Sequence, residues 1–415
     1  MDITKNEGDK LYSVKINSEE KKVYRADRCY FVQGISEGSV KIEVICKNNI
    51  KTAVLKPLSM GKVPAVSGNT VTFEAESGDK LCLVINNDKR CPLFISVSPR
   101  IKRPADDGNT LYFEGEKVYN TGIIELSDNQ TVYIGEGAVI DGGFKAENKK
   151  NIRIIGHGIV KNFSKQHITE FWYCDGIHIE GITAVGYGAW HNNWRHSCNI
   201  KVFDHKIYGG EIYSDGIDLV ACSDAHLKNI MICNNDDGIC IKLSGGKAEN
   251  IVAEDCVIWS GERGNSTEIG YELEGDYVKN ILFRNIDVIN RGTRASKFRR
   301  SAISIHNAGS AKISDIMYDN IRIEETEENL FHFERIEECP WGECRGSIEN
   351  IRLCNVSYLD IKKAPVNVIN NAKVQGKLGI SFKNLVCGGK RIETLEELKE
   401  NGLVVSGEVG IDFLK

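Results

Sequence analysis

The chain has 415 residues, and its 41% hydrophobic and 27% charged residues are typical of a folded protein rather than a disordered one. The 58 acidic residues exceed the 53 basic ones, giving a net charge of −5, so we expect no nucleic-acid partner. Because no apolar run approaches the ~18 residues of a membrane-spanning helix, we expect no membrane partner either.

The start of the chain, MDITKNEGDKLYSV, lacks the basic segment and apolar core of a signal peptide. Most of the fourteen cysteines lie in apolar runs, without the spacing of a disulfide scaffold or a zinc site. We therefore expect reduced cysteines, no metal, no cofactor and a cytoplasmic location, or a secreted one if a leader has been removed.

Short strands separated by turn signals dominate the first hundred residues. Apolar strand-like runs at 41–46, 70–75 and 80–85 alternate with turns such as Ser67-Gly68-Asn69. Strands at such intervals are typical of a β-sandwich, which we place at residues 1–103. A segment that contains Pro104 then links it to a second domain, residues 104–415.

The second domain carries an imperfect repeat in which Asn or Asp precedes isoleucine and further apolar residues. It recurs at Asn151, Asn199, Asn229, Asn250, Asn280, Asp315 and Asn350. About 22 residues supply three short strands and three turns, which is one coil of a parallel β-helix. The asparagines suit turn positions with left-handed backbone. The sequence thus predicts an all-β solenoid, with a short helix from Leu395 that stops at Gly402.

Three aspartates are the most informative residues of the solenoid. Asp215 and Asp237 are 22 residues apart, and stacked coils lie ~4.8 Å apart, so one should lie directly beneath the other. Asp236 is adjacent and projects differently. Crowded carboxylates raise at least one pKa, and a protonated acid beside ionised ones is the chemistry of glycoside cleavage.

Two simpler interpretations of the aspartates stay open. An Asp-Gly pair can be only a recurring turn, which is our interpretation of Asp175-Gly176. A calcium site also uses several carboxylates. The turn explanation is weaker for Asp236 and Asp237, because a turn needs one aspartate and not two beneath a third.

The motifs Ser214-Asp215-Gly216 and Asn235-Asp236-Asp237-Gly238 resemble the Asn-Thr-Asp-Gly and Gly/Gln-Asp-Asp motifs of glycoside hydrolase family 28, the polygalacturonases. That family and its relative family 49, the dextranases and isopullulanases, are right-handed parallel β-helices and inverting enzymes. Family 49 also carries an N-terminal β-sandwich. The resemblance, over residues 105–390, implies that Asp236 is the general acid and that Asp215 and Asp237 activate water.

Two motifs of family 28 are absent from this chain. Asn265 stands where the family has the histidine of Gly-His-Gly, and Ser304-Ile305-His306 replaces the Arg-Ile-Lys that grips the uronate carboxylate. Glu268 and Glu272 add negative charge near the expected cleft. We therefore expect a neutral or non-canonical sugar chain as the substrate rather than plain polygalacturonate.

Further substrate contacts are expected one coil before Asp215, in the segment from Trp190 to His196. Its tryptophans can stack on sugar rings and its polar residues can bind hydroxyl groups, so Trp194 and His191 are candidate substrate-binding residues. The alternative is that this segment is a loop that covers the solenoid wall. Lys242 can bind a hydroxyl group or tune Asp237. His306 is a candidate ligand or a structural histidine, and the basic run 297–300 is a solvated loop or a wall of the groove.

Three classes of function remain after this reasoning: an inverting glycoside hydrolase, a polysaccharide lyase or epimerase on the same scaffold, and a non-catalytic carbohydrate-binding solenoid. Lyases of this shape depend on calcium and a basic residue, whereas a pure binding surface has no need of a crowded acidic trio. The aspartates therefore favour the hydrolase, with a carbohydrate as its partner; the oligomeric state is not determined.

Overall fold

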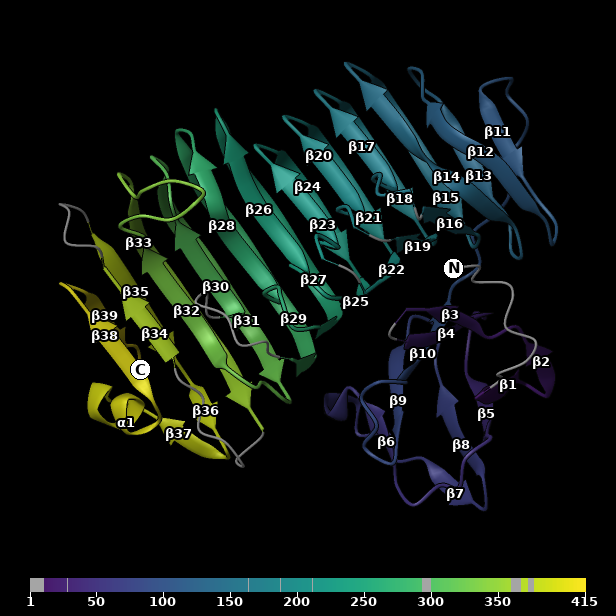
Figure 1. Ribbon diagram of the computed structural model, residues 1–415, viewed down its shortest axis with the longest axis horizontal. Helices are drawn as coiled ribbons and strands as arrows, with labels where there is room; N and C mark the ends of the chain where they lie inside the picture. The colour runs from purple at the N-terminus through teal and green to yellow at the C-terminus, as the bar shows by residue number, and fades with distance from the viewer. Residues whose placement is uncertain are drawn as a thin grey trace.

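The computed structural model describes residues 11–27, 29–162, 164–186, 188–210, 212–292, 300–359, 367–371 and 377–415. The described residues form two five-stranded sheets followed by one 29-stranded sheet that winds into a solenoid (Figure 1). Among the described residues, no helix has the length and the apolar character that crossing a bilayer requires.

The N-terminal region is the expected β-sandwich, two sheets with the strand orders β2-β1-β5-β8-β7 and β3-β4-β10-β9-β6. Alternating apolar side chains of the two sheets, such as Val14, Ile42 and Leu83, face each other in a core that water does not reach. The elements are β1 (Tyr12–Ile16), β2 (Glu19–Lys21), β3 (Tyr24–Ala26), β4 (Cys29–Ile35), β5 (Val40–Cys46), β6 (Ala53–Lys56), a 3₁₀ turn (Leu58–Met60), β7 (Ala65–Ser67), β8 (Thr70–Ala75), β9 (Lys80–Ile85) and β10 (Leu93–Ser98).

The described residues that follow the sandwich form the parallel β-helix. Its elements are β11 (Thr110–Phe113), β12 (Val118–Glu125), β13 (Thr131–Ile134), β14 (Val139–Glu147), β15 (Lys150–Gly156), β16 (Ile159–Asn162), β17 (Thr169–Trp172), β18 (Asp175–Glu180), β19 (Thr183–Gly186), β20 (Asn192–Arg195), β21 (Cys198–Phe203), β22 (Lys206–Gly209), β23 (Ile217–Val220), β24 (Ser223–Lys228), β25 (Met231–Asn234), β26 (Ile239–Ser244), β27 (Lys247–Ser260), β28 (Thr267–Glu274), β29 (Tyr277–Arg291), β30 (Ser301–Asn307), β31 (Lys312–Ile323), β32 (Asn329–Arg335), β33 (Ser347–Tyr358), β34 (Asn367–Asn370), β35 (Leu378–Lys383), β36 (Leu385–Cys387), β37 (Lys390–Ile392), α1 (Leu395–Glu400), β38 (Leu403–Ser406) and β39 (Gly410–Phe413).

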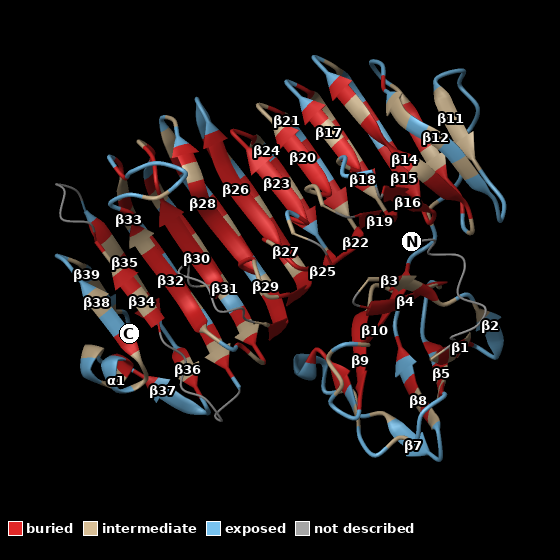
Figure 2. Ribbon diagram, in the orientation of Figure 1, coloured by how far each residue is buried: buried red, intermediate tan, exposed pale blue. Residues whose placement is uncertain are grey.

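Each coil stacks on the next through parallel pairing, which confirms the predicted parallel β-helix. One wall, which we call the site wall, consists of β17, β20, β23, β26, β28, β30, β32, β34 and β38. Along this wall Ile217 pairs with Ile239, and Ile303 pairs with Phe331. These apolar side chains form a continuous buried column, and most of the ribbon of this wall is buried (Figure 2). Because side chains alternate along a strand, the residues between them point outward.

The asparagine positions of the repeat are turns, as predicted. Asn199, Asn250 and Asn280 all have φ values of 55–56°, in the left-handed region. Their side chains also bond from coil to coil: Asn280 Nδ2 donates to Asn250 Oδ1 over 2.8 Å, and Asn199 Nδ2 donates to Asp175 Oδ1 over 2.7 Å. Asp175 therefore belongs to this ladder, in agreement with its interpretation as a turn residue.

The sandwich packs against one side of the β-helix through apolar and ionic contacts. Phe31 and Phe94 of the sandwich contact Tyr208 of β22, with ring centroids 4.5 Å and 5.6 Å apart. Beside them Asp204 lies 2.5 Å from Lys80 Nζ of the sandwich and 3.2 Å from Lys206 Nζ, all three being buried. Buried contacts of both kinds hold the two regions together.

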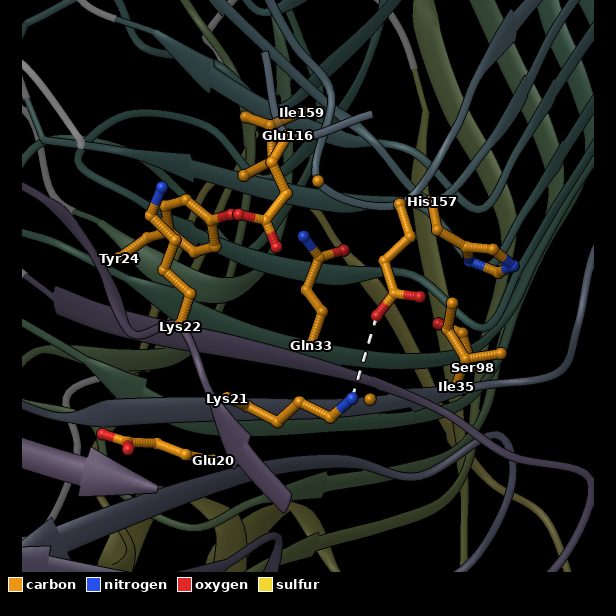
Figure 3. Close-up of a pocket in the computed structure, with 13 residues that line it drawn as sticks. Glu20, Lys21, Lys22, Tyr24, Gln33, Ile35, Ser98, Glu116, His157 and Ile159 are labelled. Atoms are coloured by element: carbon orange, nitrogen blue, oxygen red, sulfur yellow. Dashed lines mark ion pairs between the residues drawn. The ribbon is translucent and has the colours of Figure 1, made fainter. Parts of the chain in front are cut away.

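A cavity of about 330 Å³ lies at this junction (Figure 3). Lys21 and Gln33 of the sandwich line it together with Glu136 and His157 of the β-helix, and Lys21 Nζ lies 3.9 Å from Glu136 Oε1. His157 is buried and accepts a hydrogen bond from the Ile101 backbone, so this histidine has a structural role. All fourteen cysteines of the chain carry free thiols.

Candidate active site

A cavity of about 520 Å³ opens on the site wall and contains all three predicted aspartates. Residues from successive coils meet there because the strands of the wall begin at the same edge. The lining residues are Trp190, Ile212, Tyr213, Asp215, Asp236, Asp237, Lys242, Glu262, Arg263, Tyr271, Glu272, Arg300 and Trp341.

Asp215 and Asp237 occupy equivalent places on adjacent coils, as their spacing predicted. Each precedes a strand by one glycine, and the Gly216 N–H donates to the Asp237 carbonyl over 2.8 Å. A Cβ atom at Gly238 would lie 2.4 Å from the Ser266 carbonyl oxygen. The glycine after each aspartate therefore lets the coils approach closely enough to bring the carboxylates together.

Lys242 holds two carboxylates at the floor of the cavity. Its Nζ lies 3.1 Å from Asp215 Oδ2 and 2.8 Å from Asp218 Oδ1, and all three residues are buried. Burial, followed by the charge of Asp218, raises the pKa of Asp215 well above its usual range, although Lys242 opposes this. Burial raises the pKa of Asp218 to about 7. One ammonium group thus faces two acids, which favours one proton held between them.

Asp236 and Asp237 differ in their surroundings. Burial raises the pKa of Asp236, while Arg300 and a hydrogen bond from the Tyr213 backbone to Oδ2, 3.0 Å long, oppose the increase. Asp237 Oδ1 instead accepts hydrogen bonds from the Asn265 backbone N–H and from Asn265 Nδ2, over 2.7 Å and 3.1 Å. Asn265 thus positions Asp237 and does not itself line the cavity.

Aromatic rings form two walls of the cavity. The Trp190 ring lies 3.8 Å from Lys242 Nζ, measured to its centroid. On the other side Tyr271 and Trp341 pack with centroids 4.6 Å apart, and the Arg300 guanidinium lies 6.0 Å from the Tyr271 ring. Apolar faces around convergent polar groups are the arrangement of a ligand pocket.

The structure corrects the predicted roles of Trp194 and His191. Trp194 has no exposed surface, packs in the core and donates from Nε1 to Thr169 Oγ1 over 2.9 Å. His191 is buried beneath the site, with Nδ1 2.9 Å from the Asp215 carbonyl oxygen. Neither side chain can contact a sugar in the cavity. Trp190, which precedes the strand, provides the aromatic surface instead.

The remaining predicted residues divide into two groups. Lys242 and Glu272 line the cavity, in agreement with their expected position. Glu268 and His306 do not line it, because both are fully buried, and His306 Nδ1 lies 2.9 Å from Glu268 Oε2. The charge of Glu268 is thus paired with a histidine rather than directed toward the substrate.

The sequence interpretation missed Asp218, Tyr271 and Trp341. Asp218 could have been found from the sequence. Because Ile217 points inward, strand alternation directs its neighbour Asp218 outward, on the same wall as the other acids. Tyr271 and Trp341 come from later coils of unequal length, and no spacing rule brings them to the cavity. Of the basic run 297–300, only Arg300 lies within the described residues, and it lines the cavity.

A parallel β-helix with a crowded acid cluster in an aromatic-walled cavity is the architecture of a glycoside hydrolase. The sequence matches the family described as Glycosyl hydrolases family 28 over residues 50–399, so the chain belongs to that family and hydrolyses O-glycosyl bonds. A carbohydrate is therefore its substrate. No curated protein sequence matches the chain significantly.

Solved structures share the fold at low sequence identity. Dex49A from Penicillium minioluteum is 15% identical with a TM-score of 0.67, and the match covers 96% of this chain and 93% of that one. The polygalacturonase from Erwinia carotovora ssp. carotovora is 14% identical with a TM-score of 0.59, covering 75% and 90%. The exopolygalacturonase from Thermotoga maritima is 15% identical with a TM-score of 0.54, covering 69% and 85%. The two-region layout is thus shared with Dex49A over nearly the whole chain.

Proposed function

We propose that this family 28 protein is an inverting glycoside hydrolase that acts on a neutral sugar chain. Asp236 is the general acid, and Asp215 and Asp237 activate the attacking water. The observation that supports this assignment is the convergence of these three carboxylates, from two adjacent coils, in one aromatic-walled cavity of about 520 Å³.

The surroundings of Asp236 suit a proton donor. Burial favours its protonated form, and its neighbour Arg300 is a cation that can stabilise the carboxylate left after the proton has moved to the leaving oxygen. The Tyr213 backbone N–H, which bonds Oδ2, fixes the orientation of the carboxyl group. Asp236 can therefore supply the proton that glycoside cleavage requires.

The second carboxylate pair suits the activation of water. Asn265 holds Oδ1 of Asp237 through two hydrogen bonds, so this carboxylate keeps one orientation toward the cavity. Asp215 shares Lys242 with Asp218, and the pair can take up the proton released by the water. Asp237 then directs the water, and Asp215 belongs to the network that receives its proton.

The charges of the cavity support a neutral substrate. Burial favours the protonated forms of Asp215 and Asp236, so the acids that remain are Asp237, Glu262 and Glu272. Of the three basic residues that line the cavity, Lys242 is already paired with buried carboxylates. A chain of uronate units would bring further carboxylates beside these acids. Trp190, Tyr271 and Trp341 offer apolar faces that suit uncharged sugar rings.

A substrate panel tests the proposed function. The protein is incubated with neutral glucans such as dextran and pullulan and with polygalacturonate, and released reducing ends are measured. We expect release from a neutral polymer and little from polygalacturonate. Preferential release from polygalacturonate would refute the proposed substrate class, and products with an unsaturated ring, detected by ultraviolet absorbance, would indicate a lyase.

The role of Asp236 is tested by D236N, with D175N as the matched control. Asp175 also precedes a glycine of the solenoid, but it lies on the exposed turn ladder and bonds Asn199. Loss of a general acid lowers kcat by about 10²–10⁴-fold, so D236N should lose that much activity while D175N keeps it. Full activity of D236N would exclude Asp236 as the acid.

The stereochemistry is tested by proton NMR of the fresh product. Attack of water from the face opposite the leaving group yields the inverted anomer first, before mutarotation mixes the two forms. An initial signal from the retained anomer would contradict the proposed water attack, even if the three aspartates proved essential.

A further inference from the structure

A second polar cluster lies on the site wall, on the coils that follow the aspartates. His306 belongs to β30, and His332 and Glu334 belong to the next strand, β32, where Glu334 pairs directly with His306. All three alternate with core residues and therefore point outward from the solenoid. One nitrogen or oxygen atom from each lies within 4.8 Å of the other two.

Ring nitrogens of the two histidines have no hydrogen-bond partner among the described residues. His306 is 0% exposed, and its Nε2 has no hydrogen-bond partner in the part of the chain that the structure describes. His332 is 5% exposed, and its Nε2 lies 2.9 Å from Glu334 Oε2 without the alignment of a hydrogen bond. Buried polar atoms are nearly always satisfied in folded proteins, so these nitrogens point to a ligand.

Neighbouring side chains orient the cluster in the manner of an outer coordination shell. Both oxygens of the buried Glu268 lie 2.9–3.0 Å from His306 Nδ1, which favours a proton on Nδ1 and leaves Nε2 as a free electron pair. Asn370 Nδ2 donates to Glu334 Oε1 over 2.5 Å, which leaves Oε2 for another contact. Metal-bound histidines commonly have such a carboxylate behind them.

We propose that His306, His332 and Glu334 bind a divalent transition-metal ion, Zn²⁺ being the ion whose ligand preference they match. Two imidazoles and one carboxylate are a ligand set of zinc sites that keep one coordination position open. His332 and Glu334 also line a cavity of about 380 Å³, which provides the entry path and space for water at the fourth position. The proposal does not depend on the roles assigned to the three aspartates.

The metal site would lie directly behind the substrate cavity. The Tyr271 ring stacks on the His306 ring, with centroids 4.4 Å apart and planes 3° apart, and Tyr271 lines both cavities. A metal that immobilises His306 also immobilises the surface on which Tyr271 rests. The bound ion therefore positions one aromatic wall of the substrate site.

Metal binding by the full chain tests this proposal. Chelator-treated protein is dialysed to equilibrium against Zn²⁺ and the bound metal is measured by elemental analysis, with Co²⁺ as a spectroscopic probe. We expect one Zn²⁺ per chain and a visible Co²⁺ absorption without a thiolate charge-transfer band. No bound metal would overturn the proposal, and a thiolate band would assign the binding to the free cysteines instead.

Variants assign the binding to these residues. H332Q and E334Q should lose the bound Zn²⁺, and E268Q should weaken its affinity by about 10–100-fold, as loss of an outer-shell partner does. H226Q is the matched control, because His226 Nε2 also lies 2.9 Å from a carboxylate, that of Glu254, on another wall of the solenoid. Circular dichroism verifies the fold of each variant. Equal Zn²⁺ binding by H332Q, E334Q and H226Q would overturn the assignment.

Discussion

Replacement of Asp218 by asparagine tests the electrostatics of the active site. Asp218 is fully buried, its Oδ1 lies 2.8 Å from Lys242 Nζ, and burial raises its pKa to about 7. In the unfolded chain an aspartate has a pKa of about 3.9. The folded protein therefore keeps a proton that the unfolded chain releases between these two values.

The sign and size of the effect follow from this difference. A raised pKa contributes stability that is fully present below about pH 4 and is lost as the pH rises through about 7. A difference of about 3 in pKa corresponds to at most about 4 kcal/mol, of which at most about 3 kcal/mol falls between pH 5 and pH 7. The asparagine side chain of D218N does not titrate, so the unfolding free energy of the variant relative to the wild type should increase over that interval by up to this amount.

Urea unfolding, followed by tryptophan fluorescence at several pH values from 5 to 8, measures this difference. D141N is the matched control, because Asp141 also pairs with a lysine, Lys161, at 2.6 Å, but its side chain is 40% exposed. We expect the stability of D218N relative to the wild type to rise with pH more steeply than that of D141N. A constant difference between D218N and the wild type from pH 5 to pH 8 would refute this account of the Asp218–Lys242 pair.

Three further predictions concern the cavity wall, the acid and the domain junction. W190A should raise KM by about 10-fold, because the substrate loses buried apolar contact. W194F should leave KM unchanged and lower the unfolding free energy by about 1–2 kcal/mol. Equal effects of the two variants on KM would contradict the placement of Trp190 in the cavity wall and Trp194 in the core. Because Arg300 opposes the increase in the pKa of Asp236, R300Q should raise that pKa further. The alkaline limb of the pH profile of kcat/KM should then move to higher pH. An alkaline limb that does not move would contradict the role of Asp236 as the acid. D204N leaves two buried lysines, Lys80 and Lys206, without their carboxylate. Urea unfolding should therefore show that the free energy of unfolding falls by about 3–5 kcal/mol. A decrease below about 1 kcal/mol would argue against a role of this ion cluster in joining the domains.

The parts of the fold that repeat could be predicted from the chain. The 22-residue step that separates Asp215 from Asp237 equals one coil, so the alignment of the two carboxylates follows from counting residues. The asparagines at the turns are likewise local, because their left-handed backbone needs only a short polar side chain. Repeat length and turn chemistry therefore predicted both the solenoid and the acid cluster.

The direction of single side chains near strand ends could not be predicted in this way. Trp190 and Trp194 differ by four residues, yet one lines the cavity and the other has no exposed surface. The difference depends on where β20 begins, because Trp194 lies within the strand, where side chains alternate between the core and the outer face, whereas Trp190 precedes it. Sequence patterns locate such boundaries only to within a few residues.

The sequence by itself determined the winding of the chain and the meeting of Asp215, Asp236 and Asp237, because both depend on a short-range repeat. Only the tertiary structure decided what surrounds them: Lys242 between two acids, Tyr271 and Trp341 as a wall, and the cluster that contains His306. Those contacts join coils whose lengths differ through inserted loops, and the register across such loops is set by packing of the whole solenoid rather than by any local pattern.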